Sequence, residues 1–65
     1  MLNVVLGKKI KSLRIHNNMT QTDVANALNM SQSAYSRMER GETSAWIMKV
    51  ENIYTLYNIS LQDLL

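Results

Sequence analysis

The chain has 65 residues, of which 46% are hydrophobic, and it contains no cysteine and no proline. This length allows a single domain, and without cysteine its core cannot depend on disulfides or thiolate zinc sites. The formal net charge is only +2, but residues 1–40 hold six basic and two acidic side chains, whereas residues 41–65 hold one and three. A basic surface on one part of a small domain suits a polyanionic partner.

Several classes of protein are not expected from this sequence. No apolar segment approaches the roughly 20 residues that span a bilayer. The mostly apolar residues 1–6 precede the first lysines, which is the reverse of a secretory signal. The single histidine, His16, has no acidic residue near it in sequence, and no glycine-rich phosphate loop or metal-ligand spacing occurs. We therefore expect a cytoplasmic protein that is not an enzyme and takes no cofactor, metal or small-molecule ligand.

The hydrophobic pattern predicts five short helices and no strand. The first is expected over residues 4–16, because apolar side chains recur at helical spacing from Leu6 onwards. Asn3 is a candidate N-cap for this helix. The pair at residues 17–18, two asparagines, tolerates left-handed geometry and should end the helix.

The second and third helices are expected to lie close together. The sequence Thr-Gln-Thr-Asp resembles a capping box and starts the second helix at Thr20, and Asn29 ends it. Ser31 is a good N-cap for the third helix, which should run to Arg40 and stop at Gly41. Because only about three residues connect the two helices, they must cross at a steep angle.

A fourth helix is expected over residues 45–57, capped by Thr43 or Ser44 and ended by Asn58. A second sequence like a capping box starts the fifth helix, over residues 61–65. The predicted fold class is all-α, with residues 1–65 forming one domain, a compact bundle of five short helices. The side chains expected in its core are Leu6, Ile10, Leu13, Val24, Ala25, Leu28, Tyr35, Met38, Ile47, Val50, Ile53 and Leu64.

The third predicted helix has two different faces. At 100° per residue, one face gathers the polar side chains of Gln32, Ser33, Ser36, Arg37 and Arg40. Tyr35 and Met38 fall on the opposite face. The polar face carries no acidic residue, and its arginines and glutamine can form bidentate hydrogen bonds with guanine and adenine in a major groove. The wheel alone is equally compatible with a solvated surface helix.

Three segments at matching spacing resemble the helix-turn-helix domain of the Cro and lambdoid-repressor type. They read LGKKIKSLR, TQTDVANALNMSQSAYSRMERG and NISLQDLL, and the resemblance extends from Leu6 to Leu65. It implies a bacterial or phage transcriptional regulator, expected to be a repressor, that binds double-stranded DNA with its third helix in the major groove. A domain this small offers few contacts, which favours a homodimer on a pseudo-palindromic operator. Pairing is expected on DNA and is not required of the free domain.

The resemblance also implies roles for individual residues. The positions that match base contacts are Gln32, Ser33, Ser36 and Arg37. The positions that match DNA backbone contacts are Thr20, Gln21, Arg40, Thr43 and Ser44. Gln21 and Gln32 match a pair of glutamines that hydrogen-bond to each other. Arg14 and Glu39 match a partly buried salt bridge between the first helix and the end of the third.

The sequence departs from this family at several positions. Glu42 stands where a lysine is common, and an acid there disfavours a phosphate contact. Ala45 stands where proline often starts the fourth helix. Tyr54 and Tyr57 replace a small residue and a leucine, and Trp46 has no counterpart. These three aromatic side chains belong either to the core, the interpretation that we favour, or to a dimer interface, where aromatic residues are enriched.

A protein-interaction module is the alternative function. Some domains of this shape serve as antitoxins, antirepressors or oligomerisation domains. Such a module would carry apolar or acidic residues where this sequence has Gln32, Ser33 and Arg37. The residue types on the third helix therefore favour DNA.

Overall fold

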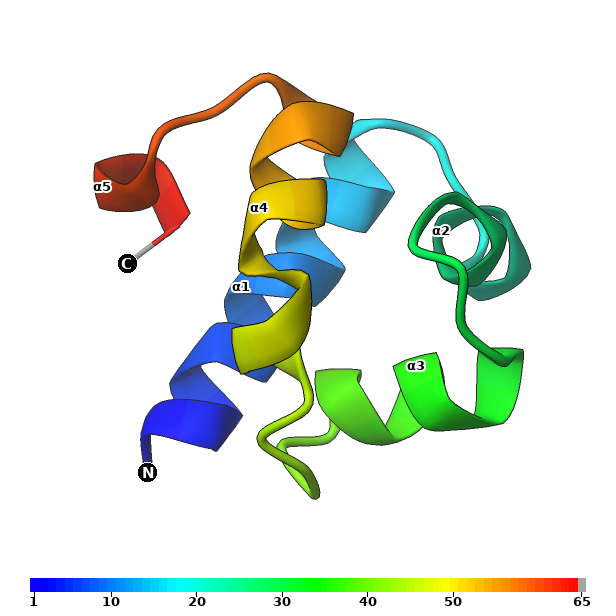
Figure 1. The fold of residues 1–65 in the computed structure, drawn as a ribbon, viewed down its shortest axis with the longest axis vertical. Helices are drawn as coiled ribbons and strands as arrows, with labels where there is room; N and C mark the ends of the chain where they lie inside the picture. Colours follow the sequence, from blue (N-terminus) through cyan, green and yellow to red (C-terminus); the bar gives the residue numbers. More distant parts are fainter. Residues whose placement is uncertain (65) are drawn as a thin grey trace.

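The computed structural model describes residues 1–64, except for the side chains of Leu61 and Leu64. The regular secondary structure of these residues is entirely helical, which confirms the predicted all-α fold class. The helices are α1 (Leu2–His16), α2 (Gln21–Ala27), α3 (Gln32–Glu39), α4 (Trp46–Tyr57) and α5 (Leu61–Leu64), as Figure 1 shows. Along this part of the chain, no helix is long and apolar enough to cross a membrane.

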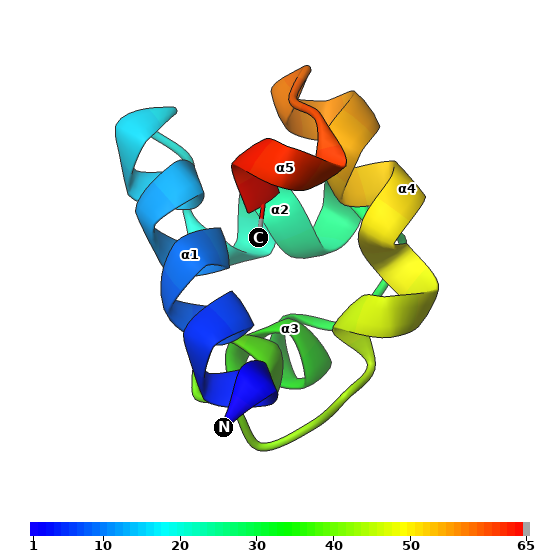
Figure 2. The ribbon, with the colours of Figure 1, turned by 90° about the vertical axis from the view of Figure 1, so that its left-hand side faces the viewer.

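The longest helix, α1, contacts α3, α4 and α5. Figure 1 shows α2 and α3 on one side of α1, α4 in front of it, and α5 at the opposite edge. Seen from the side in Figure 2, α5 lies in front, between α1 and α4, and α3 closes the lower end of the bundle. Packing of α3 against both α1 and α2 fixes its position, and its outer surface is left uncovered.

Local hydrogen bonds account for the starts of α2 and α3. The Thr20 hydroxyl oxygen accepts from the backbone N–H of Asp23 at 3.0 Å, and an Asp23 carboxylate oxygen accepts from the Thr20 N–H at 2.9 Å. This confirms the predicted capping box. The Ser31 hydroxyl oxygen accepts from the N–H of Ala34 at 3.1 Å, which confirms Ser31 as the N-cap of α3.

Left-handed residues separate the helices, as predicted. Asn18, Asn29 and Asn58 have φ of 56°, 57° and 53°, and Gly41 has φ of 74°. Asparagine and glycine occupy this region most readily among the amino acids. Gly41 has a second constraint, because an added Cβ would lie 2.7 Å from the Cα of Val4 in α1.

The predicted start of α1 is wrong. The helix begins at Leu2, with Met1 at the N-cap and no side-chain capping bond. Asn3 lies inside the helix, where its Oδ1 accepts a hydrogen bond from the indole Nε1 of Trp46 at 2.8 Å. This bond joins residues 43 positions apart, so the short polar side chain connects α1 to α4 instead of capping α1.

The start of α4 also differs from the prediction. Neither Thr43 nor Ser44 caps it, and the N-cap is Ala45, which has no side-chain capping bond. Thr43 Oγ1 instead accepts from the N–H of Ala45 at 3.1 Å and stabilises the turn that leads into the helix.

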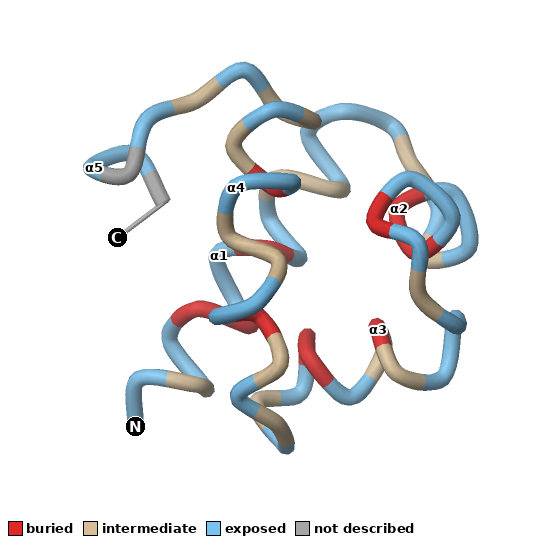
Figure 3. The backbone as a smooth tube through the Cα atoms, viewed as in Figure 1, coloured by how far each residue is buried: buried red, intermediate tan, exposed pale blue. Residues whose placement is uncertain are grey.

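Most of the predicted core is confirmed, and Figure 3 shows that its buried segments lie on the facing sides of the helices. The buried hydrophobic side chains are Leu6, Ile10, Val24, Ala25, Leu28, Tyr35, Met38, Trp46 and Ile53. Leu13, Val50, Tyr54 and Tyr57 are partly buried and pack against this cluster. The three aromatic side chains Trp46, Tyr54 and Tyr57 therefore contribute to the core of the single chain.

Ile47 is the exception, since 58% of it is exposed and its predicted burial is wrong. It lies about 100° around α4 from Trp46, which is buried as the favoured interpretation expected, and Ile47 is therefore turned away from the core. The predicted burial of Leu64 falls outside the described side chains.

Gly7 allows α1 to approach the end of α3 closely. A Cβ at this position would lie 2.5 Å from the backbone oxygen of Glu39 and 2.6 Å from that of Met38. Alanine favours a helix over glycine by about 1 kcal/mol. We nevertheless expect Gly7→Ala to lower the free energy of unfolding by about 1–3 kcal/mol, because backbone must move to admit the methyl group.

Urea denaturation followed by circular dichroism measures this effect. Ser12→Ala, on the exposed face of the same helix, is the control, and it should leave stability unchanged or raise it slightly. If Gly7→Ala behaved like the control, the close approach of α1 and α3 would have no energetic importance.

Candidate nucleic-acid interface

The outer face of α3 is polar and accessible. Tyr35 and Met38 are fully buried on the inner face and anchor the helix to the core. Gln32, Ser33 and Arg37 are exposed on the opposite side. A short turn after α2 holds the two helices at a steep angle (Figure 1), and α3 therefore presents its polar face away from the body of the protein.

The first residues of α2 and α3 meet at this surface. Gln21 begins α2 and Gln32 begins α3. The Nε2 of Gln32 donates to the Oε1 of Gln21 at 2.6 Å, and Nε2 of Gln21 donates to the Oε1 of Glu39 at 3.1 Å. The structure thus brings the two glutamines together and also joins them to the end of α3. Sequence reasoning paired the glutamines and paired Arg14 with Glu39, but it missed the bond that connects the two pairs.

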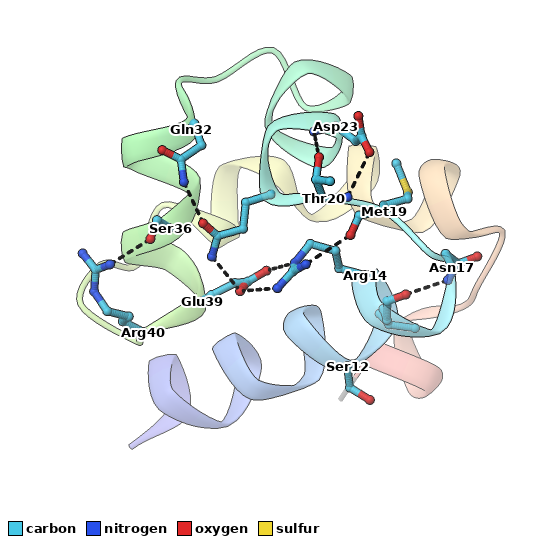
Figure 4. Close-up of polar contacts among 12 residues, drawn as sticks. Ser12, Arg14, Asn17, Met19, Thr20, Asp23, Gln32, Ser36, Glu39 and Arg40 are labelled. Carbon is cyan, nitrogen blue, oxygen red and sulfur yellow. Dashed lines mark hydrogen bonds and ion pairs between the residues drawn. The ribbon is translucent and has the colours of Figure 1, made fainter.

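Arg14 holds the other side of the Glu39 carboxylate. Its Nε donates to Oε2 at 2.6 Å and its Nη2 donates to Oε1 at 3.3 Å, while its Nη1 donates to the backbone oxygen of Met19 at 3.1 Å. The side chains of Arg14 and Glu39 are only 14% and 3% exposed. Figure 4 shows these bonds as one continuous path from Gln32 through Glu39 to Arg14 and Met19.

The surroundings of Glu39 keep it ionised. Burial raises the pKa of this carboxyl, but hydrogen bonds from Arg14 and from Gln21, together with the arginine charge, outweigh it, and the net pKa lies below its usual value. The Tyr35 and Tyr57 hydroxyls are buried nearby without a hydrogen-bond partner in the described part of the chain. Burial and, to a smaller extent, the negative charge of Glu39 raise the pKa of both phenols, and the pKa of Tyr57 reaches about 12.

A second ion pair joins Arg40, one of the predicted contact residues, to Glu42. Arg40 donates from Nε to Oε2 of Glu42 at 2.8 Å and from Nη2 to Oε1 at 3.3 Å. Its Nη1 donates to the hydroxyl oxygen of Ser36 at 2.7 Å (Figure 4). Both charged side chains are about half exposed, at 54% and 51%. The sequence places Arg40 and Glu42 only two positions apart, but the turn at Gly41 decides that they meet.

The remaining candidate residues lie at the start of α2, in α3 and in the loop that follows α3. The hydroxyls of Thr20 and Thr43 accept capping or turn bonds, and Ser44 is exposed beside Thr43. Arg37 is exposed, and its guanidinium forms no ion pair with any residue of the described range 1–64. Of the arginines on α3 and at its end, Arg37 is thus the one that can engage a ligand without first losing a salt bridge.

A tightly connected helix pair, with a polar and exposed second helix held from behind by α1, defines a helix-turn-helix protein. The chain belongs to the helix-turn-helix family, a family of DNA-binding domains, and the family model matches residues 10–64. Membership confirms the resemblance to the Cro and lambdoid-repressor type.

Among curated proteins, the chain is similar to the antitoxin PezA of Streptococcus pneumoniae. The two are 33% identical over 60 residues, which make up 92% of this chain and 38% of the relative. The chain therefore spans well under half of the length of that relative. No solved structure shows a significant match.

Proposed function

We propose that this chain binds double-stranded DNA sequence-specifically, with α3 in the major groove, and that it acts as a bacterial or phage transcriptional repressor. The observation that carries the proposal is the division of α3, with Gln32, Ser33 and Arg37 exposed and Tyr35 and Met38 buried. The exposed side chains offer the hydrogen-bond donors and acceptors that base edges present. Membership of the helix-turn-helix family supports the same function.

The candidate contacts fall into two groups. Those assigned to base edges are Gln32, Ser33, Ser36 and Arg37. Those assigned to the DNA backbone are Thr20, Gln21, Arg40, Thr43 and Ser44. Backbone contacts set the register of the protein on the duplex, and base contacts give it specificity. In this scheme Ser36 and Arg40 exchange their present bonds for DNA, because they are bonded to each other in the free protein.

We further propose that residues 1–65 form the DNA-binding domain and bind as a homodimer. A domain of this size makes few contacts by itself, so two copies on half-sites about one helical turn apart are needed for tight specific binding. The operator is then a pseudo-palindrome.

In vitro selection from a randomised duplex library tests the proposal. The expected result is a consensus with two-fold symmetry that contains a strongly preferred guanine in each half. A consensus without symmetry would contradict the homodimer. If no sequence were enriched, while the protein remained folded by circular dichroism, sequence-specific binding itself would be wrong.

A protein-binding role is the second candidate, and two observations favour it. The relative PezA is named an antitoxin, and the hydrophobic residues Leu2, Val5, Ile47 and Met48 on α1 and α4 are more than half exposed. A gel shift with random duplex at two salt concentrations separates the candidates. A DNA-binding domain retards the duplex and loses affinity steeply with salt. A module that binds only protein does not retard the duplex at either salt concentration.

Glu42 is expected to weaken DNA binding, because it occupies the guanidinium of Arg40 and adds a negative charge beside the duplex. Glu42→Gln should therefore raise the affinity for all DNA sequences several-fold. The dependence of affinity on salt should stay close to that of wild type, because Arg40 makes the same phosphate contact in both proteins.

Fluorescence anisotropy at several salt concentrations measures both quantities. Glu51→Gln is the matched control, since it makes the same change of charge on the exposed surface of α4. If both variants gained affinity equally, net charge alone would explain the gain, and the contact between Arg40 and Glu42 would have no part in it.

A further inference from the structure

The hydrogen bonds from Glu39 to Gln32 have only one consistent direction. An ionised carboxylate accepts hydrogen bonds and cannot donate them. Gln21 must therefore turn its Nε2 towards Glu39, and this leaves its Oε1 facing Gln32. Because that oxygen also only accepts, Gln32 must turn its own Nε2 towards Gln21. The charge on Glu39 thus sets the orientation of both amide groups.

This orientation decides which atoms of Gln32 remain for a ligand. One N–H of its Nε2 is used by Gln21, so the second N–H and the Oε1 remain. An acceptor next to a donor matches the major-groove edge of adenine, which offers N6–H and N7. Guanine presents two acceptors there, O6 and N7, so the Oε1 of Gln32 would face another acceptor.

Without this constraint the nitrogen and oxygen of the Gln32 amide would have no fixed positions. The terminal torsion of a glutamine side chain is broad and roughly two-fold, so nitrogen and oxygen exchange places easily. Glu39 removes that freedom from a position where it cannot touch DNA, since its side chain is 3% exposed and lies behind Gln21. Arg14 in turn holds both carboxylate oxygens of Glu39.

We propose that Glu39 is a positioning residue for specificity: it fixes the donor and acceptor order of Gln32 through Gln21, and so makes α3 select adenine at one base pair. This inference rests on the proposed DNA-binding function. It adds a determinant of base preference that makes no contact with DNA itself.

The first test is a titration of single-base operator variants. Gln32→Ala identifies the base pair that Gln32 reads, as the position where discrimination is lost. A bidentate contact discriminates by about 5- to 150-fold. Glu39→Gln should lower the preference for adenine at that base pair by about fivefold or more and leave the preference at other positions unchanged, because the new amide can donate or accept. Glu51→Gln, which removes a charge on α4, should retain every preference.

Gln21→Met provides a second variant that keeps the buried salt bridge intact. It interrupts the path of hydrogen bonds between Glu39 and Gln32 and should weaken the preference for adenine at the same base pair. The double variant, Gln21→Met with Glu39→Gln, should prefer adenine as strongly as Gln21→Met alone, because Glu39 acts only through Gln21. Additive losses, or an unchanged adenine preference in Glu39→Gln, would overturn the inference and leave DNA binding intact.

A readout without DNA separates this inference from the proposed function. In NMR spectra of the free protein, Glu39→Gln should shift the side-chain amide protons of both Gln21 and Gln32, whereas Glu51→Gln should shift neither. If the Gln32 signal did not move, the path would not exist and the inference would be wrong. If it moved but wild-type protein bound no DNA, the proposed function would be wrong and the specificity role with it.

Discussion

Replacement of Glu39 by alanine is expected to lower the free energy of unfolding by about 2–4 kcal/mol. The substitution leaves the Arg14 guanidinium mostly buried, at 14% side-chain exposure, without its carboxylate partner. It also removes the acceptor of the Gln21 amide. Removing one member of a buried pair is more destabilising than the net contribution of the pair suggests, because the remaining charge stays desolvated.

The chain contains its own control for this experiment. Arg40 and Glu42 form a similar two-bonded contact, but their side chains are about half exposed. Glu42→Ala should therefore change stability little, because solvent replaces the lost partner. Urea denaturation of both variants, followed by circular dichroism, compares the loss of a buried ion pair with the loss of an exposed ion pair that has similar hydrogen bonds. If Glu39→Ala were as stable as wild type, the Arg14–Glu39 pair would not contribute to holding α3 in place.

The difference between wild type and Glu39→Ala should depend on pH. The net pKa of Glu39 in the folded protein lies below its usual value of 4.5, so its ionised form stabilises the fold. This contribution is complete above 4.5 and is lost as the pH falls through the lower pKa of the folded state. Urea midpoints measured from neutral pH downwards should therefore converge in acid. A constant difference at every pH would show that the ionisation of Glu39 has no role.

Arg37→Ala is expected to lower affinity for the preferred operator by about 1–3 kcal/mol and to relax discrimination at one base pair, a guanine. Arg37 lies one turn after Ser33 on the exposed face of α3, where the side chains of an inserted helix meet base edges. Because Arg37 has no ion pair in the described part of the chain, its guanidinium is available to DNA without rearrangement.

Arg40→Ala is the matched comparison on the same helix end. Arg40 follows the last residue of α3. In the proposed complex the chain leaves the groove at this point and approaches the DNA backbone. Its loss should weaken binding to all sequences alike and reduce the salt dependence by about one unit. Both variants are titrated against single-base operator variants at several salt concentrations. If Arg37→Ala weakened all variants equally, Arg37 would contact phosphate only. If neither variant changed affinity, the protein-binding candidate would replace the DNA-binding one.

Features that depend on neighbours along the chain could be predicted from the amino-acid sequence alone. The cap of α2 links Thr20 and Asp23, three positions apart, and Ser31 caps α3 over the same distance. Asn29 and Gly41 end helices because left-handed geometry is a property of the single residue. The burial of most core positions followed from helical periodicity, which is also local. Such features can be recognised before the packing of the helices is known.

Tertiary structure decided which side chains from different helices meet. Asn3 would be a reasonable N-cap, yet the approach of α4 to α1 gives it the indole of Trp46 as a partner. The same packing places Trp46 inward and leaves Ile47 exposed. The two glutamines and the salt bridge of Glu39 were each expected from family resemblance, but their connection depends on the crossing angle and separation of α2 and α3. A shift of about one ångström between two helices is enough to break a hydrogen bond between them. The sequence pattern does not determine the positions of helices to that precision.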